Sequence, residues 1–201
     1  MTLLARKDFP PANYKELEAY VRANKDKVSL ANAGLGAVSH LCGLLFMSQI
    51  GVELNTIPYK GTGPAMTDLL GGQVDIMCDQ TTNTTKQIQG GTIKAYAVTS
   101  PKRLDVLPDV PTAEEGGLAG FQVGIWHGLY APKGTPAEIT DRLSKSLQVA
   151  LKDQTVVARF AELGTVPSTE ADATPAALKA KLESEILRWK PVIEAAGQYA
   201  D

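Results

Sequence analysis

The 201-residue sequence predicts an α/β fold with a parallel-type sheet, followed by a mostly helical C-terminal part. Four short apolar runs recur at regular intervals, and helical patterns fill the gaps between them. Such an alternation of strands and helices is typical of a parallel sheet. A glycine-rich turn joins the first run to an apolar helix, and Gly63-Pro64 and Gly71-Gly72 bound the helix before the third run.

The elements follow one another in chain order. A helix over residues 14–24 carries apolar residues on one face. The four expected strands lie at residues 28–31, 52–57, 74–78 and 93–98. A Pro/Gly-rich connection then contains a short helix over residues 112–116, and a long strand follows over residues 121–130.

Beyond residue 130 the pattern becomes helical. Thr135-Pro136-Ala137-Glu138 is typical of a capping box with proline at the first helical position. The expected helix carries Ile139, Leu143 and Leu147, a second spans residues 156–163, and a third begins at Pro175. The third has an apolar stripe of Leu178, Leu182, Ile186, Trp189 and Ile193, and Pro191 is expected to kink its end. These helices have almost no sheet to pack on.

Composition limits the function. The sequence is 44% hydrophobic and 21% charged, which supports a sizeable core, and its net charge of −2 gives no basic surface for nucleic acid. No apolar run approaches the length of a membrane span. Residues 1–8 hold too short an apolar segment for a secretion signal, so we expect a cytoplasmic chain or one that has been processed or trimmed.

The turn between the first strand and its helix predicts an anion site. Glycines at 34 and 36 expose backbone amides at a helix N-terminus, where the helix dipole favours negative charge. No charged residue occurs from Val28 to Ile50, so the charge is expected on the ligand, as a carboxylate. The candidate contacts are Ala33, Gly34, Leu35, Gly36, Ala37, Ser39 and His40. The alternative is that the glycines only allow the strand and helix to pack closely.

A dinucleotide site does not fit this turn. The third glycine of G-x-G-x-x-G would fall on Ser39, and the next strand ends in Ile57-Pro58 where an acidic residue is needed. Other strand ends are polar, and ligands of open parallel sheets bind at such ends. They add Thr62, Asp79 and Gln80 as candidates, with Asp79 either accepting from a ligand donor or capping the following helix. Lys60 either adds positive charge there or is simply solvated.

Catalytic, cofactor and metal sites are not predicted. Ser39 and His40 are sequence neighbours and point apart on a helix, no serine lies in a G-x-S-x-G elbow, and the histidines and cysteines lack metal-ligand spacing. Trp126 and His127 fit core or hinge packing as well as ligand contact. Cys42 and Cys78 are close enough in such a fold for a disulfide, but their apolar surroundings lead us to expect two buried free thiols.

Several blocks resemble one known family. They are Tyr59-Lys60-Gly61-Thr62-Gly63-Pro64 with its continuation to Asp75, then Ala97-Val98-Thr99, Leu107-Pro108-Asp109-Val110-Pro111-Thr112 and Gly128-Leu129-Tyr130-Ala131-Pro132-Lys133-Gly134. Together they resemble the Bug family, the periplasmic solute receptors of tripartite tricarboxylate transporters. The likeness runs from about Lys7 to Asp201.

The resemblance implies a two-lobed receptor of the Venus-flytrap type, similar to type II periplasmic binding proteins. A small organic acid would lie between the lobes, and the membrane components of a tripartite transporter would be the partners. Residues 7–125 would form one complete α/β lobe. Residues 126–201 would supply the hinge strand and C-terminal helices of the other, incomplete lobe, because family members carry a further segment ahead of Lys7. Residues 34–40 match the family's carboxylate turn, with Ala37 replacing a serine, and Asp79-Gln80 match its polar strand end.

Two expectations follow for the chain as a whole. A solute-binding receptor for a carboxylate or dicarboxylate, located in the periplasm, is the first. The alternative is an interaction module that meets a protein partner through its exposed helices. In both cases the uncovered apolar stripes predict self-association, most simply as a two-fold homodimer.

Overall fold

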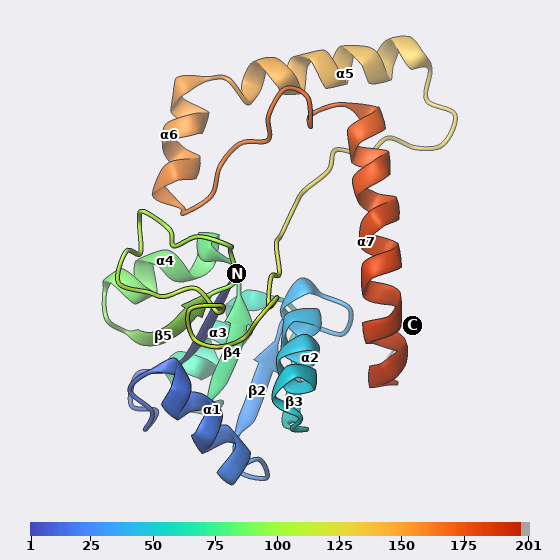
Figure 1. Cartoon of the computed structure of the whole chain (residues 1–201). Helices are drawn as coiled ribbons and strands as arrows, with labels where there is room; N and C mark the ends of the chain where they lie inside the picture. Colours follow the sequence, from blue (N-terminus) through green and yellow to red (C-terminus); the bar gives the residue numbers. More distant parts are fainter. Residues whose placement is uncertain (198–201) are drawn as a thin grey trace.

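A computed structural model gives the structure of the chain and describes residues 1–197. Its centre is a five-stranded sheet in the order β3-β2-β4-β1-β5 (Figure 1). The strands are β1 (Thr2–Arg6), β2 (Ser29–Asn32), β3 (Asn55–Pro58), β4 (Ile76–Asp79) and β5 (Ile93–Val98). β2 pairs in parallel with β3 and β4, whereas β1 pairs antiparallel with β4 and β5. The four expected strands form, and β1 makes the sheet mixed.

Strand β1 was not predicted. It lies between β4 and β5, and Leu3 is paired with Cys78 on one side and with Ala97 on the other. Successive side chains point to opposite faces, so Leu3 and Ala5 join one core cluster and Leu4 the other. The sheet therefore includes residues 2–6, ahead of Lys7 where the lobe was expected to begin.

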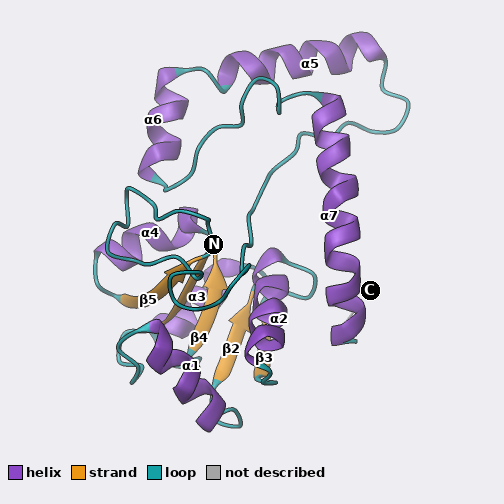
Figure 2. Cartoon of the chain, in the orientation of Figure 1, coloured by secondary structure: helices purple, strands orange, loops and turns teal. Residues whose placement is uncertain are grey.

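Helices cover both faces of the sheet (Figure 2). α1 (Tyr14–Ala23) and α2 (Val38–Ile50) pack on one face, where Leu17, Val21 and Phe46 are buried. α3 (Thr62–Leu70) packs on the other with Ala65, Met66 and Leu69, and α4 (Thr81–Gln89) adds Ile88. The burial of α2 on nearly all sides explains its uniformly apolar sequence.

The connection after β5 differs from expectation in two places. Residues 112–116 form a turn rather than a short helix, closed by reciprocal hydrogen bonds in which Thr112 N donates to Glu115 Oε2 and Glu115 N to Thr112 Oγ1. Residues 121–130 form no strand. Phe121 and Val123 are buried against the core, but the chain then leaves the sheet, and strand structure needs a neighbouring strand.

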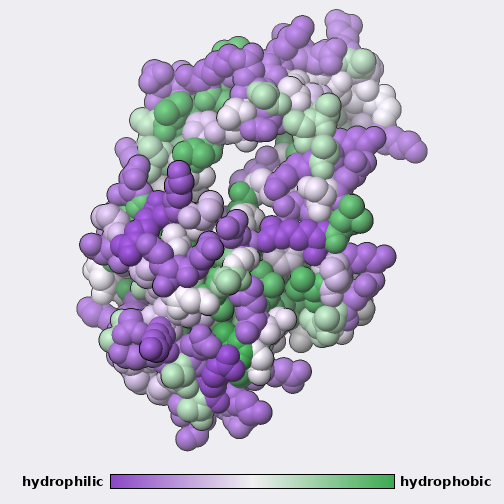
Figure 3. All heavy atoms as spheres, in the orientation of Figure 1, coloured by the Kyte–Doolittle hydropathy of each residue, from purple (hydrophilic) through white to green (hydrophobic). Residues whose placement is uncertain are grey.

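The C-terminal helices stand away from the sheet. α5 (Ala137–Ala150), α6 (Gln154–Glu162) and α7 (Pro175–Ala196) contain no buried residue, and Figure 3 shows an opening through the molecule beneath them. α7 continues past Pro191 to Ala196. Trp189 packs against the core cluster beside α2, which is one attachment of this part to the sheet.

The expected capping box at the start of α5 does not form. Pro136 is the N-cap, and Thr135 Oγ1 donates instead to the carbonyl of Pro132, at 2.8 Å. A turn that the preceding Pro-Lys-Gly sequence allows therefore competes successfully for the hydroxyl. Across residues 1–197, no helix has the length and apolar character needed to cross a membrane.

Candidate ligand-binding site

The carboxyl ends of β2, β3 and β4 meet at one edge of the sheet, as their parallel pairing requires. The loops that follow touch one another: Gly61 N donates to the carbonyl of Ala33 at 3.1 Å, and Thr62 Oγ1 donates to Asp79 Oδ1 at 3.5 Å. The structure thus brings together the glycine turn, Thr62 and Asp79. β2 has β3 on one side and β4 on the other, which is the position where ligands bind in open α/β sheets.

The glycine turn, residues 33–37, needs its two glycines. Gly34 has φ +118° and Gly36 has φ +75°, conformations that other L-residues rarely adopt. A Cβ on Gly34 would also lie 3.2 Å from the carbonyl oxygen of Tyr59. Close packing against β3 is therefore real, and it accompanies rather than replaces the anion-site geometry.

Side chains hold the glycine turn in shape. Ala33 N donates to Ser39 Oγ at 2.8 Å, Gly34 N donates to Asn32 Oδ1 at 2.9 Å, and Gly36 N donates to His40 Nδ1 at 3.2 Å. Ser39 and His40 are buried, whereas Gly36 is exposed. The two expected contact side chains thus orient the loop backbone. Asn32 was not singled out from the sequence, although its place between strand and glycine turn is typical of an Asx turn.

The N-terminus of α2 lies directly behind the turn. Ala37 is its N-cap and provides no side-chain cap, and the first turn contains no acidic residue. The leading N–H groups of an α-helix have no partner within the helix and carry its positive dipole end. Val38 and Ser39 are the leading residues of the helix here. The site can therefore accept a carboxylate from the backbone alone.

Asp79 ends β4 and is 2% exposed. Burial raises its pKa to about 6, while hydrogen bonds from the Gln80 backbone, from Asn83 and from Thr62 oppose that rise. Asn83 Nδ2 lies 3.4 Å from Oδ2. Gln80 is the N-cap of α4 and is half-buried. A buried carboxylate with long, weak hydrogen bonds is suited to accept a further donor. Asn83, one helical turn further on, belongs to the polar strand end predicted from the sequence, although it was not among the candidate contacts.

The other charged and aromatic candidates lie at the surface or outside this edge. Lys60 is exposed, as a solvated lysine would be. His127 is exposed and Trp126 half-buried on the segment that leaves the sheet. Within residues 1–197 no group of three His, Cys, Asp or Glu side chains could hold a metal ion.

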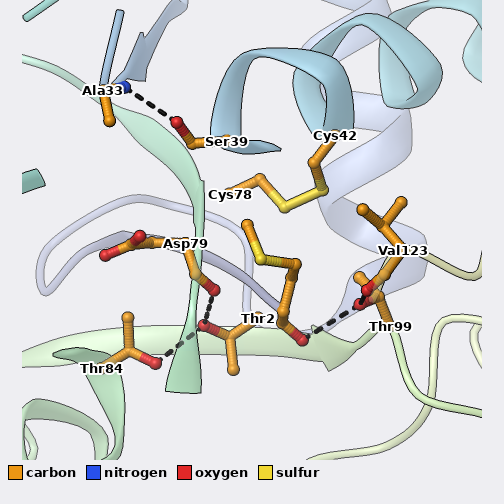
Figure 4. The surroundings of a disulfide bond; sticks show 10 residues. Thr2, Ala33, Ser39, Cys42, Cys78, Asp79, Thr84, Thr99 and Val123 are labelled. Atoms are coloured by element: carbon orange, nitrogen blue, oxygen red, sulfur yellow. Dashed lines mark hydrogen bonds between the residues drawn. A yellow bond between two sulfur atoms is a disulfide. The ribbon is translucent and has the colours of Figure 1, made fainter. Parts of the chain in front are cut away.

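The expectation of two free thiols was wrong. Cys42 on α2 and Cys78 on β4 form a disulfide, with Cα atoms 6.1 Å apart (Figure 4). Both residues are fully buried in the same core cluster. Packing of α2 directly over β4 brings the two cysteine side chains close enough for their sulfur atoms to bond. This placement is a tertiary feature, which the apolar neighbours in the sequence do not reveal.

A mixed α/β sheet with a glycine turn and a helix N-terminus at its carboxyl edge fits the class of solute-binding receptors. The comparisons with known proteins agree. The model of the family described as "Tripartite tricarboxylate transporter family receptor" (TctC) matches residues 1–198, and the chain belongs to this family.

Individual relatives give the same result. A UPF0065 protein from the TAR-I ttuE-ttuC' intergenic region of Agrobacterium vitis is 52% identical over 98% of this chain and 57% of its own length. The periplasmic binding protein BugD is 57% identical, with a TM-score of 0.93 over 98% of this chain and 65% of that one. MatC from Rhodopseudomonas palustris, solved with bound malate, is 42% identical, with a TM-score of 0.92 over 96% of this chain and 65% of its own.

The similarity to these relatives covers nearly all of this chain but only part of each relative. The chain spans about 57–65% of the length of these relatives. Family members and structural neighbours are substrate-binding receptors, and BugD is a periplasmic binding protein.

Proposed function

We propose that this chain is the ligand-binding part of a periplasmic receptor for a small dicarboxylate, which it delivers to the membrane components of a tripartite transporter. The observation that carries the proposal is the turn at residues 33–37 before the uncapped start of α2, placed beside buried Asp79. The malate bound to MatC supports a ligand of this size and charge. Membership of the receptor family supports the transporter as partner.

The first turn of α2 binds one ligand carboxylate through backbone N–H groups, and the glycine turn shapes the surface around it, since its amides at residues 33, 34, 36 and 37 donate within the chain. The contact residues are Ala33, Gly34, Leu35, Gly36, Ala37, Ser39 and His40. Ser39 and His40 act by orienting the backbone, since their side chains already accept from Ala33 and Gly36. No protein cation is needed at this carboxylate, because the helix dipole and several N–H groups share the charge.

Asp79 accepts a hydrogen bond from a hydroxyl or amino group on the ligand backbone. It lies across from the glycine turn, and Thr62 and Gln80 flank it. A hydroxy acid such as malate offers a hydroxyl donor as well as its carboxylates, whereas succinate offers only the carboxylates. Discrimination by one such hydrogen bond to a charged group amounts to about 1.5–3 kcal/mol.

We assign two units to the chain, residues 7–125 with the preceding strand β1, and residues 126–201. The change after Val123, where burial against the sheet ends, supports the boundary. The second unit carries the hinge segment and helices α5–α7 of the other lobe, and residues 198–201 lie outside the described part.

A thermal-shift screen with small dicarboxylates tests the proposed function. Malate should raise the melting temperature of the wild-type chain and leave Gly36→Pro unchanged, since proline cannot adopt φ +75° and removes the N–H that donates to His40, so the turn loses its shape. Lys60→Ala is the matched control and should respond like wild type. Circular dichroism checks that Gly36→Pro is folded. An equal response of folded Gly36→Pro and wild type would contradict the assignment.

A second candidate is self-association through the uncovered helices. Leu182, Ile186, Trp189 and Ile193 line an apolar groove on α7, and Ile139 and Leu143 of α5 are exposed. Apolar surface of this extent favours association. We propose a homodimer of this 201-residue chain that buries these stripes, and this state is compatible with ligand binding at the sheet edge.

A further inference from the structure

We propose that the Cys42–Cys78 disulfide is a positioning element that sets the spacing between the glycine turn and Asp79, and so determines the preference for dicarboxylates that carry a hydrogen-bond donor. This inference rests on the proposed function, because it assigns the two sides of that site to one ligand. The disulfide would act on the geometry of the site, in addition to any contribution to the stability of the fold.

The sheet divides at the edge where the ligand would bind. β2 and β4 are paired only at Leu30–Ile76 and Ala31–Met77. Beyond Ala31 the chain of β2 follows β3 instead: Asn32 is paired with Pro58, and the carbonyl of Asn32 accepts from Tyr59 N at 2.9 Å. The glycine turn is therefore attached to the β3 side.

Asp79 is attached to the other side of this division. It is paired with Thr2 of β1, and its carbonyl accepts from Thr2 Oγ1 at 3.0 Å. Thr2 Oγ1 in turn lies 2.9 Å from Thr84 Oγ1 on α4. The two halves of the site thus lie beyond the last β2–β4 pair of one continuous sheet, and each is held there by a different neighbouring strand.

The disulfide crosses the division next to both halves. Cys42 lies one helical turn beyond Ser39, whose hydroxyl holds Ala33, and Cys78 immediately precedes Asp79 (Figure 4). The hydrogen bond from Thr62 to Asp79 also crosses, but at 3.5 Å it is weak. At the opposite end of these strands, Asp75 lies directly before β4 and connects β2 with β1. It accepts hydrogen bonds from Ser29 N at 2.9 Å and from Arg6 Nε at 3.0 Å. The disulfide therefore holds the strands together at the edge of the site, as the hydrogen bonds of Asp75 hold them together at the opposite end.

Removal of the bond should relax the spacing. When the disulfide is reduced, the distance between the two sulfur atoms must increase from bonding distance to van der Waals contact, by roughly 1.5 Å. A binding site loses selectivity when its contact groups deviate by more than about 0.5 Å from the geometry that binds the ligand best. A ligand that must reach both sides is affected most, whereas one that uses only the glycine turn is affected little.

The experiment compares L-malate with succinate by NMR titration of backbone amides in the oxidised chain and in Cys42→Ala/Cys78→Ala. We expect the oxidised chain to prefer malate by about tenfold, the equivalent of one hydrogen bond to a charged group. In the double variant the preference should fall by about threefold or more, while succinate affinity changes by less than about twofold. Val21→Ala, a buried truncation in the same core cluster on α1, is the control for lost stability and should keep the full preference.

Reduction of the wild-type chain gives a second route if the double variant does not fold. Dithiothreitol converts the disulfide to two thiols and is itself oxidised to its cyclic disulfide, and alkylation followed by mass analysis confirms the change. The same loss of preference is expected. An unchanged malate-to-succinate ratio in the variant or the reduced chain would overturn the positioning role while leaving the proposed function intact. If the oxidised chain binds neither acid, the proposed function fails, and the positioning role fails with it.

Discussion

The hydroxyl of Thr62 donates to Oδ1 of Asp79 across 3.5 Å, joining the first residue of α3 to the last residue of β4. Thr62 follows the edge strand β3, Asp79 ends β4, and β2 lies between these two strands in the sheet. The glycine turn touches the same region, because Gly61 N donates to the carbonyl of Ala33. The contact is long, and Asp79 is almost fully buried. A buried carboxylate with weak partners is costly when ionised, and its titration should be measurable.

The first prediction concerns this titration. Burial raises the pKa of Asp79 from 3.8 to about 6 in the folded chain. Between these values the folded chain binds more protons than the unfolded one, so the free energy of unfolding should fall as pH rises from about 4 to about 6. The full loss is about 2–3 kcal/mol. Asp79→Asn should remove this slope and be more stable than wild type at neutral pH.

Urea unfolding at a series of pH values measures this effect. Asp26→Asn, which alters an exposed carboxylate on the loop after α1, is the control and should keep the wild-type slope. Parallel pH profiles for wild type and Asp79→Asn would show that the carboxylate is better solvated or better paired than its burial indicates.

The second prediction concerns the attachment of the C-terminal helices. The carbonyl of Gly164 accepts from Thr81 Oγ1 at 3.2 Å, and a Cβ on Gly164 would lie 2.9 Å from Val106 Cγ2. Gly164 has φ +67°, and Gly91 has φ +61° with open space around it. Gly91→Ala should therefore cost about 1 kcal/mol from backbone strain alone. Gly164→Ala should cost about 2–3 kcal/mol because crowding adds to the strain.

Equilibrium unfolding of the two variants, side by side, makes the comparison. Equal losses would mean that the segment at Gly164 moves away from α4 without penalty, so that the contact with Thr81 contributes nothing to stability.

The third prediction concerns self-association. Ile186 is 56% exposed and lines the groove on α7, whereas its neighbour Leu187 is 75% exposed and lies outside the groove. Burying one large apolar side chain contributes about 1.5–3 kcal/mol. In sedimentation equilibrium at micromolar concentration, the chain should form dimers that Ile186→Glu shifts toward monomer and Leu187→Glu does not. A monomeric wild-type chain, or an equal effect of both substitutions, would remove the groove from consideration.

The sequence predicted those elements that local patterns determine. The four predicted strands with the helices between them, the helix that ends before Gly71 and the glycine turn all formed, because strand alternation, helix punctuation and positive-φ glycines act over a few residues. β1 was missed because a short terminal run becomes a strand only through pairing with β4 and β5. Residues 121–130 carry a strand-like pattern yet lack a partner strand, so the pattern alone was misleading.

The candidate site divides in the same way. Strand ends and glycines are local signals, and the structure brings the predicted Thr62 and Asp79 together at one edge of the sheet. The roles of Ser39 and His40 as holders of the loop backbone depend on side-chain directions that spacing does not give. The disulfide depends on how α2 lies over β4.

Titration of the isotope-labelled chain with malate, followed by amide NMR, tests the central claim most directly. If the glycine turn and the start of α2 bind a carboxylate, the largest shifts should fall on the amides of Gly34 to His40, with a second group at Asp79 and Gln80. Saturable shifts should persist in Lys60→Ala at millimolar ligand. Shifts confined to other surfaces, or none at these amides when the ligand is saturating, would contradict the account.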